Sequence, residues 1–181
     1  MKRVVVTFGI LSGVLSSLMM CVSLVFMDSI GFDYGLIYGY TAIVLSFLFV
    51  FFGIRSYRDN VGGGSIAFGR AFLVGILITL ISCGFYVMTW EILYFNFLPD
   101  FMDKWAAYAI EQAKASGASE AAIQARDEEM HRIKELLQNP FYNAALTFVE
   151  PFPVGLAITL LSAAILRKKP AGAVAQTQAA L

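Results

Sequence analysis

The chain has 181 residues, of which 59% are hydrophobic and only 14% are charged, and its formal net charge is zero. A soluble globular domain carries about 25% charged residues, so this composition excludes an ordinary soluble domain. The balanced charge also gives no sign of nucleic acid as a partner, and the length suits a single domain.

Four apolar stretches are long enough to cross a bilayer as helices: residues 4–27, 35–54, 71–94 and 141–166. The first stretch contains no charged side chain and makes about 36 Å of helix, more than the hydrocarbon thickness of about 30 Å. It is also too long for a secretion signal and lacks an Ala-x-Ala site. We therefore expect an all-α polytopic membrane protein, with one four-helix transmembrane domain over residues 1–169.

A short turn, residues 28–34, separates the first two spans, and a polar link with three consecutive glycines, residues 55–70, separates the second from the third. The glycines lack the GxxxxGK[ST] spacing, so we do not expect a phosphate-binding loop. Arg55, Arg58 and Arg70 are expected at the headgroup level, where each basic residue contributes about 1 kcal/mol of attraction to anionic lipid.

Residues 99–139 are rich in charge and alanine and predict a helical hairpin between spans three and four. Gly117 is a good helix stop, and Ser119 is expected to cap the second helix. Each helix carries an apolar face, and the two faces are expected to pack on each other or to lie on the outer leaflet. The residues of these faces are Phe101, Trp105 and Tyr108, and Ile123, Met130, Ile133 and Leu137.

Basic residues are distributed unevenly between the two sides of a four-span thread. The N-terminus, the link and the segment after span four hold eight basic residues and one acid, whereas the opposite side holds five basic and ten acidic residues. Because Lys and Arg concentrate in cytoplasmic loops, both termini are predicted to be cytoplasmic and the hairpin extracytoplasmic. The alanine-rich tail, residues 170–181, is expected to be disordered.

Glu91 and Glu150 lie inside apolar spans, and ionisable residues at such positions are functional candidates by default. Helical rise places Glu91 about 31 Å and Glu150 about 25 Å from the cytoplasmic face, so both belong to the outer half of the membrane. If the carboxylates face each other, they form a proton or cation site. Alternatively, Glu91 reaches water and Glu150 hydrogen-bonds near a helix break at Pro151 and Pro153.

Gly9, Gly13 and Ser17 recur every four residues in the first span. Such small-residue faces let helices approach closely, either within the bundle or between two copies of the chain. Cys21 and Cys83 are interpreted as small buried side chains and His131 as a solvated residue. Since no nucleophile–base pair or metal-ligand cluster is visible, we expect no enzyme, no catalytic residue, no metal and no cofactor.

Several motifs carry a resemblance to a known family: FFGIRSYRD at residues 51–59, IAFGRAF at 66–72, KASG at 114–117 and PVG at 153–155. With these motifs the chain resembles the bacterial family called domain of unknown function 4199. The resemblance implies a small four-span protein of the bacterial inner membrane, with no established activity and no site residues to transfer.

Two hypotheses for function follow. The first is a non-enzymatic membrane protein that acts by association with itself, as a homo-oligomer, or with a membrane protein partner in the lipid bilayer. The alternative is a small proton- or cation-coupled transporter that uses Glu91 and Glu150.

Overall fold

The computed structural model describes residues 1–168, apart from the side chains of residues 28–30, and its regular elements are helices. The predicted disordered tail, residues 170–181, lies outside the described residues. The elements are α1 (Lys2–Asn60), α2 (Phe68–Asn96), α3 (Phe101–Ala115), α4 (Glu120–Leu137), α5 (Pro140–Val149) and α6 (Pro151–Leu166).

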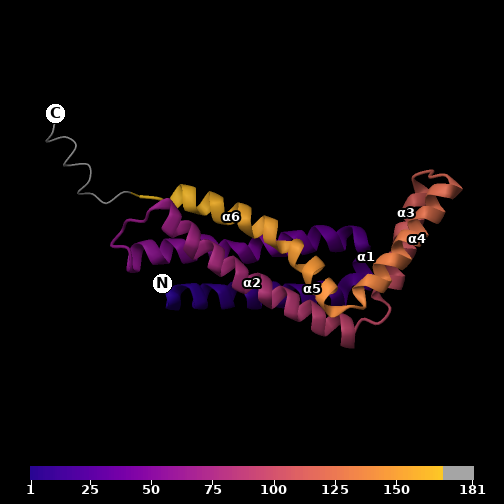
Figure 1. Ribbon diagram of the computed structural model, residues 1–181, viewed down its shortest axis with the longest axis horizontal. Coiled ribbons are helices and arrows are strands. Elements are labelled where there is room, and N and C mark those ends of the chain that lie inside the picture. Colours follow the sequence, from indigo (N-terminus) through magenta and orange to yellow (C-terminus); the bar gives the residue numbers. More distant parts are fainter. Residues whose placement is uncertain (169–181) are drawn as a thin grey trace.

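Four helical segments are long and apolar enough to cross a membrane: Lys2–Met27, Gly31–Asn60, Phe68–Asn96 and Pro140–Leu166. Each contains one of the four predicted apolar stretches, and α3 and α4 lie between the third and the fourth. The prediction of an all-α chain with four candidate spans is therefore confirmed. The spans run alternately up and down the long axis of the molecule (Figure 1).

A single glycine reverses the chain between the first two spans. The backbone of Gly31 has φ 73° and ψ 167°, while helical structure continues on both sides of it. Only glycine adopts this conformation without steric cost. The turn is therefore shorter than the predicted residues 28–34, and it divides α1 into an N-terminal arm, Lys2–Met27, and a C-terminal arm, Gly31–Asn60.

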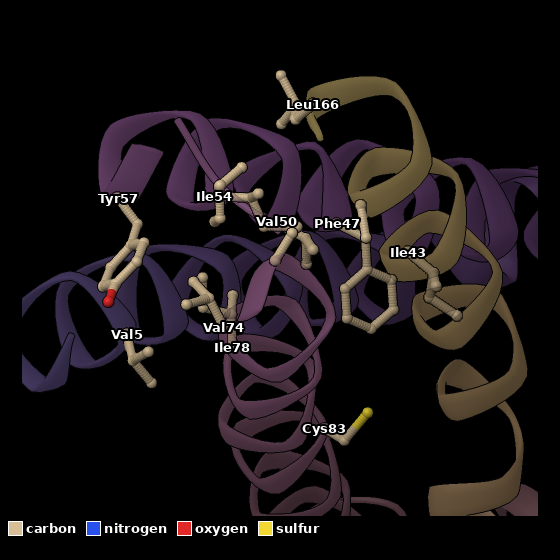
Figure 2. Packing of buried hydrophobic residues seen from close by; sticks show 13 residues of the cluster. Val5, Ile43, Phe47, Val50, Ile54, Tyr57, Val74, Ile78, Cys83 and Leu166 are labelled. Atoms are coloured by element: carbon tan, nitrogen blue, oxygen red, sulfur yellow. The ribbon is translucent and has the colours of Figure 1, made fainter. Parts of the chain in front are cut away.

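The C-terminal arm of α1 supplies the centre of the apolar core. Phe47, Val50 and Ile54 are buried at helical spacing on one face of this arm, and Val74 and Ile78 of α2 belong to the same cluster. Figure 2 shows these side chains together between the two helices. The core therefore lies in the half of the bundle away from the α3–α4 hairpin.

The third and fourth spans approach closely through small residues. Oγ1 of Thr79 lies 3.0 Å from Oγ1 of Thr159. A Cβ added to Gly155 would lie 2.5 Å from Cγ2 of Thr79, and one added to Gly75 would lie 2.8 Å from Cγ2 of Thr159. Only glycine fits at these two positions, and the paired hydroxyls satisfy each other in an apolar interior.

Both ends of the described chain lie at one end of the bundle (Figure 1). Ile66, in the link between α1 and α2, and Lys168, after α6, donate backbone hydrogen bonds to each other at 3.0 and 2.9 Å. The link and the segment after the fourth span therefore meet, as a four-span thread requires. The α3–α4 hairpin lies at the opposite end of the bundle (Figure 1).

The hairpin turns at Gly117, which has φ 76°, and Oγ of Ser119 accepts a hydrogen bond from the backbone of Ala122 as the predicted helix cap. An ion pair between Asp103 and Lys134 joins α3 to α4. Met102 of α3 and Met130 of α4 are buried. The hairpin is thus a compact unit that follows the third span.

The aromatic face of α3 contacts the turn of α1, a partner that the sequence analysis did not predict. The ring of Phe32 lies 5.3 Å from that of Trp105 and 5.1 Å from that of Tyr108. The hydroxyl of Tyr108 donates to Asp33, and this hydrogen bond raises the pKa of Tyr108. The hairpin is therefore attached to the first turn as well as to the spans that precede and follow it.

Candidate functional site

A cavity of about 760 Å³ lies between the hairpin and the adjoining ends of the spans. We call it the hairpin-end cavity. Residues of all six helices line it, from Ser16 in α1 to Val154 in α6. Its volume lies within the range of about 300–1,000 Å³ that is usual for small-molecule sites.

Most of the cavity wall is apolar and adaptable. Four methionines contribute to it, and flexible methionine side chains adjust to ligands of different shape. Aromatic rings from several helices complete the wall, and both tryptophans of the chain, Trp90 and Trp105, are among them. The methionines are Met19, Met20, Met27 and Met102.

Glu150 is the one carboxylate among the described residues that line the cavity. The hydroxyl of Tyr86, on α2, donates to Oε2 of Glu150 across 3.0 Å. Because Tyr86 also lines the cavity, this hydrogen bond places the carboxylate at the wall between the third and fourth spans.

Glu150 stands beside two prolines at the point where the helix of the fourth span is divided. Glu150 stands between the end of α5 at Val149 and the start of α6 at Pro151. Proline has no backbone N–H, so Pro151 and Pro153 leave the carbonyls four residues earlier without their usual helical donors. The boundary between α5 and α6 therefore falls at the acid, and the carbonyls four residues before the prolines belong to residues 147 and 149, which also line the cavity.

A buried asparagine connects three helices at the cavity wall. Nε1 of Trp90 donates to Oδ1 of Asn143 across 2.9 Å, and Nδ2 of Asn143 donates to the carbonyl of Leu137 across 3.1 Å. Oγ1 of Thr147 also donates to Oδ1 of Asn143, at 3.3 Å. Asn143 is 0% exposed, so its amide holds α2, the end of α4 and α5 together without contact with solvent.

Sequence reasoning missed Asn143 and Tyr86 as site residues. The available signal was an amide side chain near the start of an apolar span, because such groups need an interhelical partner in a membrane. Trp90, the donor to Asn143, was not predicted as a site residue either.

The structure does not bring Glu91 into the same site as Glu150. Glu91 is absent from the residues that line the hairpin-end cavity, and its Oε1 is buried without a hydrogen-bond partner among the described residues. The hypothesis of a shared proton between the two acids therefore has no common cavity to support it.

The small-residue face of the first span packs inside the chain. A Cβ added to Gly13 would lie 2.6 Å from Cγ of Phe85 in α2. Oγ of Ser17 lies 2.7 Å from Oγ1 of Thr89, also in α2. Gly9 makes the corresponding close approach to Ile81. This face is thus covered by the third span rather than open to a second copy.

The predicted headgroup residues lie at the other end of the bundle. Arg55 and Arg58 both pair with Asp59, with N–O distances of 3.7 and 2.7 Å, and Arg70 is exposed in the first turn of α2. His131 is exposed, and its Nε2 lies 3.9 Å from Oδ1 of Asp127. None of these residues lines the hairpin-end cavity.

Comparison with known families found a match. The family model described as "Protein of unknown function (DUF4199)" matches residues 7–168. Comparison with curated proteins and with solved structures found no match. The matched region contains every residue that lines the hairpin-end cavity.

Proposed function

The chain belongs to the DUF4199 family of proteins of unknown function, and we propose that it is a non-enzymatic protein of the bacterial inner membrane that acts by associating with a membrane-borne partner. The hairpin-end cavity carries this proposal, because it is a sizeable apolar site formed by all six helices. Its position next to four candidate spans makes a molecule dissolved in the membrane the natural occupant.

The polar groups of the cavity favour binding over catalysis. Its hydroxyl groups come from Ser16, Ser23 and Thr147, with Tyr40 and Tyr86, and the described lining contains no histidine or lysine. A serine or threonine nucleophile needs an adjacent base, and the one carboxylate of the described lining, Glu150, accepts instead from the hydroxyl of Tyr86. Oγ of Ser16 donates instead to the carbonyl of Gly13 across 2.8 Å, which is a structural hydrogen bond.

Self-association, one of the two expected forms of association, receives less support from the geometry. The Gly9–Gly13–Ser17 face would have supplied a homodimer, but Ile81, Phe85 and Thr89 of α2 occupy it. The hairpin-end cavity has no such occupant among the described residues.

We assign both termini to the cytoplasm and the hairpin to the opposite side. The support is the excess of basic residues around the N-terminus, the link and Lys168, which share one end of the bundle. Lys and Arg are retained on the cytoplasmic side during insertion. The hairpin-end cavity then lies in the outer half of the membrane.

Transport of protons or cations by paired acids receives less support, because Glu91 lies outside the cavity that contains Glu150. A flux assay in proteoliposomes tests it directly. Flux that disappears in Glu150→Gln and in Glu91→Gln would favour transport over association.

Native mass spectrometry of the protein extracted from its own membranes tests the proposed function. Gly39 lines the cavity, and a Cβ added there meets nothing within 4 Å, so Gly39→Leu adds bulk at the cavity wall. Gly84→Leu is the matched control, because Gly84 is equally open but lies outside the cavity. We expect a bound molecule in the wild type and in Gly84→Leu, and its loss in Gly39→Leu. No bound molecule, or the same one in all three proteins, would contradict the proposal.

A further inference from the structure

We infer that the hairpin-end cavity binds a lipophilic cation, such as an amine or an onium ion with an apolar body, and that Glu150 is its counter-ion. The inference rests on the proposed function and adds the chemical class of the partner. It comes from the charge, the aromatic wall and the size of the cavity, each of which limits what can bind there.

The ionisable side chains of the described lining are acidic only. Among the described lining residues, Glu150 is the one carboxylate, and none is an arginine, lysine or histidine. Tyr86 donates a hydrogen bond to Oε2 of Glu150, but a neutral donor does not cancel a negative charge. A carboxyl group at membrane depth either takes up a proton or pairs with an opposite charge. A cationic ligand supplies the opposite charge that the described lining lacks.

The aromatic wall suits the same cation. Trp90, Trp105, Tyr40 and Tyr86 all line the cavity, and the negative face of an aromatic ring attracts a cation within about 6 Å. Edge-on contacts hold the tryptophans in place, since the ring centroid of Trp90 lies 5.1 Å from that of Phe101. The same cavity therefore offers one carboxyl group among its described residues and several aromatic rings that can attract a cation without a second charge.

The lining also disfavours a phospholipid headgroup. A lipid with an ethanolamine headgroup offers an ammonium, but it brings a phosphate that pairs best with arginine or lysine. The described lining supplies neither residue. The volume of about 760 Å³ has room for a drug-sized apolar body. We therefore assign the site to a lipophilic cation that carries no phosphate.

Binding of matched ions to the detergent-purified protein tests this inference. Tetraphenylphosphonium and tetraphenylborate have nearly the same size and shape but opposite charge. Both tryptophans of the chain line the cavity, so intrinsic fluorescence reports its occupancy. We expect a saturable fluorescence change with the phosphonium and none with the borate. Equal responses to the two ions would overturn the inference.

Two variants separate charge from structure. Glu150→Gln keeps an acceptor for Tyr86 and removes the charge, and we expect affinity for tetraphenylphosphonium to fall at least about tenfold, as expected for the loss of a close charge pair. Glu91→Gln also removes an acid from a span but lies outside the cavity, so it should bind like the wild type. Unchanged affinity in Glu150→Gln would contradict the inference, and thermal unfolding of both variants checks that they are folded.

Competition identifies the source of the cation. Decylammonium should displace the phosphonium, whereas a short-chain phosphatidylethanolamine should not, and the reverse order would contradict the assignment. If the wild type carries a neutral molecule that Gly39→Leu loses, and the phosphonium does not bind, the ligand class is wrong and the proposed function stands. If Gly39→Leu changes neither the molecule found by native mass spectrometry nor the binding of the phosphonium, the proposed function and the ligand class are both wrong.

Discussion

The indole nitrogen of Trp90 donates to the side-chain oxygen of Asn143 across 2.9 Å, and this hydrogen bond joins the third span to the fourth at the wall of the cavity. The amide nitrogen of Asn143 then reaches the carbonyl of Leu137 at the end of the hairpin. One buried side chain therefore sets the position of two spans relative to the segment that connects them.

Replacing Asn143 by leucine should destabilise the protein by about 1–2 kcal/mol, the upper range for interhelical hydrogen bonds in membranes. The substitution leaves Nε1 of Trp90 and the carbonyl of Leu137 without their partner. Thermal unfolding in detergent measures the effect. Asn96→Ala is the control, because the side chain of Asn96 is exposed and bonds only within its own helix. Equal stability of wild type and Asn143→Leu would show that the network contributes nothing.

Gly13→Leu should lower stability by about 1–3 kcal/mol, as overpacking does in well-packed interiors, because its side chain would collide with Phe85. The oligomeric mass in detergent should not change. Gly84→Leu, which meets nothing within 4 Å, should unfold like the wild type. A variant Gly13→Leu that keeps its stability but loses an oligomer would show that this face joins two copies of the chain.

Phe32→Ala should loosen the hairpin without unfolding the spans. Phe32 contacts the rings of Phe101, Trp105 and Tyr108, and each such pair contributes about 0.5–1.5 kcal/mol. Hydrogen exchange in residues 101–115 should accelerate by about tenfold or more. Tyr34→Ala, which alters a 69%-exposed side chain near the same turn, should leave this exchange unchanged. Unaltered exchange in Phe32→Ala would mean that the turn does not hold the hairpin.

Single-cysteine labelling should place the two ends of the bundle on opposite sides of the membrane. In a chain whose two native cysteines are replaced, Ala121→Cys in the hairpin should react with an impermeant maleimide added outside the cell, because the hairpin is assigned to that side. Asn60→Cys, at the other end, should react only after permeabilisation. Both positions are exposed. The opposite pattern would reverse the assigned orientation.

The sequence predicted the features that depend on local patterns. Apolar length identified all four candidate spans, and the turn chemistry of Gly117 and Ser119 identified the hairpin. These features follow from transfer into lipid and from backbone preferences, which a single segment carries by itself.

The features that depend on distant contacts could not be predicted in the same way. Helical rise gave similar heights to Glu91 and Glu150, but rise says nothing about which way a side chain points around its helix. The aromatic face of α3 was evident, but its partner Phe32 lies beside the turn of α1, distant in the sequence. The cavity itself results from the combined placement of six helices.

Photocrosslinking in living cells tests whether the hairpin-end cavity holds a membrane-borne partner. Benzoylphenylalanine is placed at Leu36, which lines the cavity, or at Leu45 on the same arm, which does not. The two side chains are similarly exposed, at 46% and 43%. We expect a discrete small-molecule adduct at Leu36 that is missing at Leu45 and lost with Gly39→Leu. Identical bulk-lipid adducts at both positions would contradict the account.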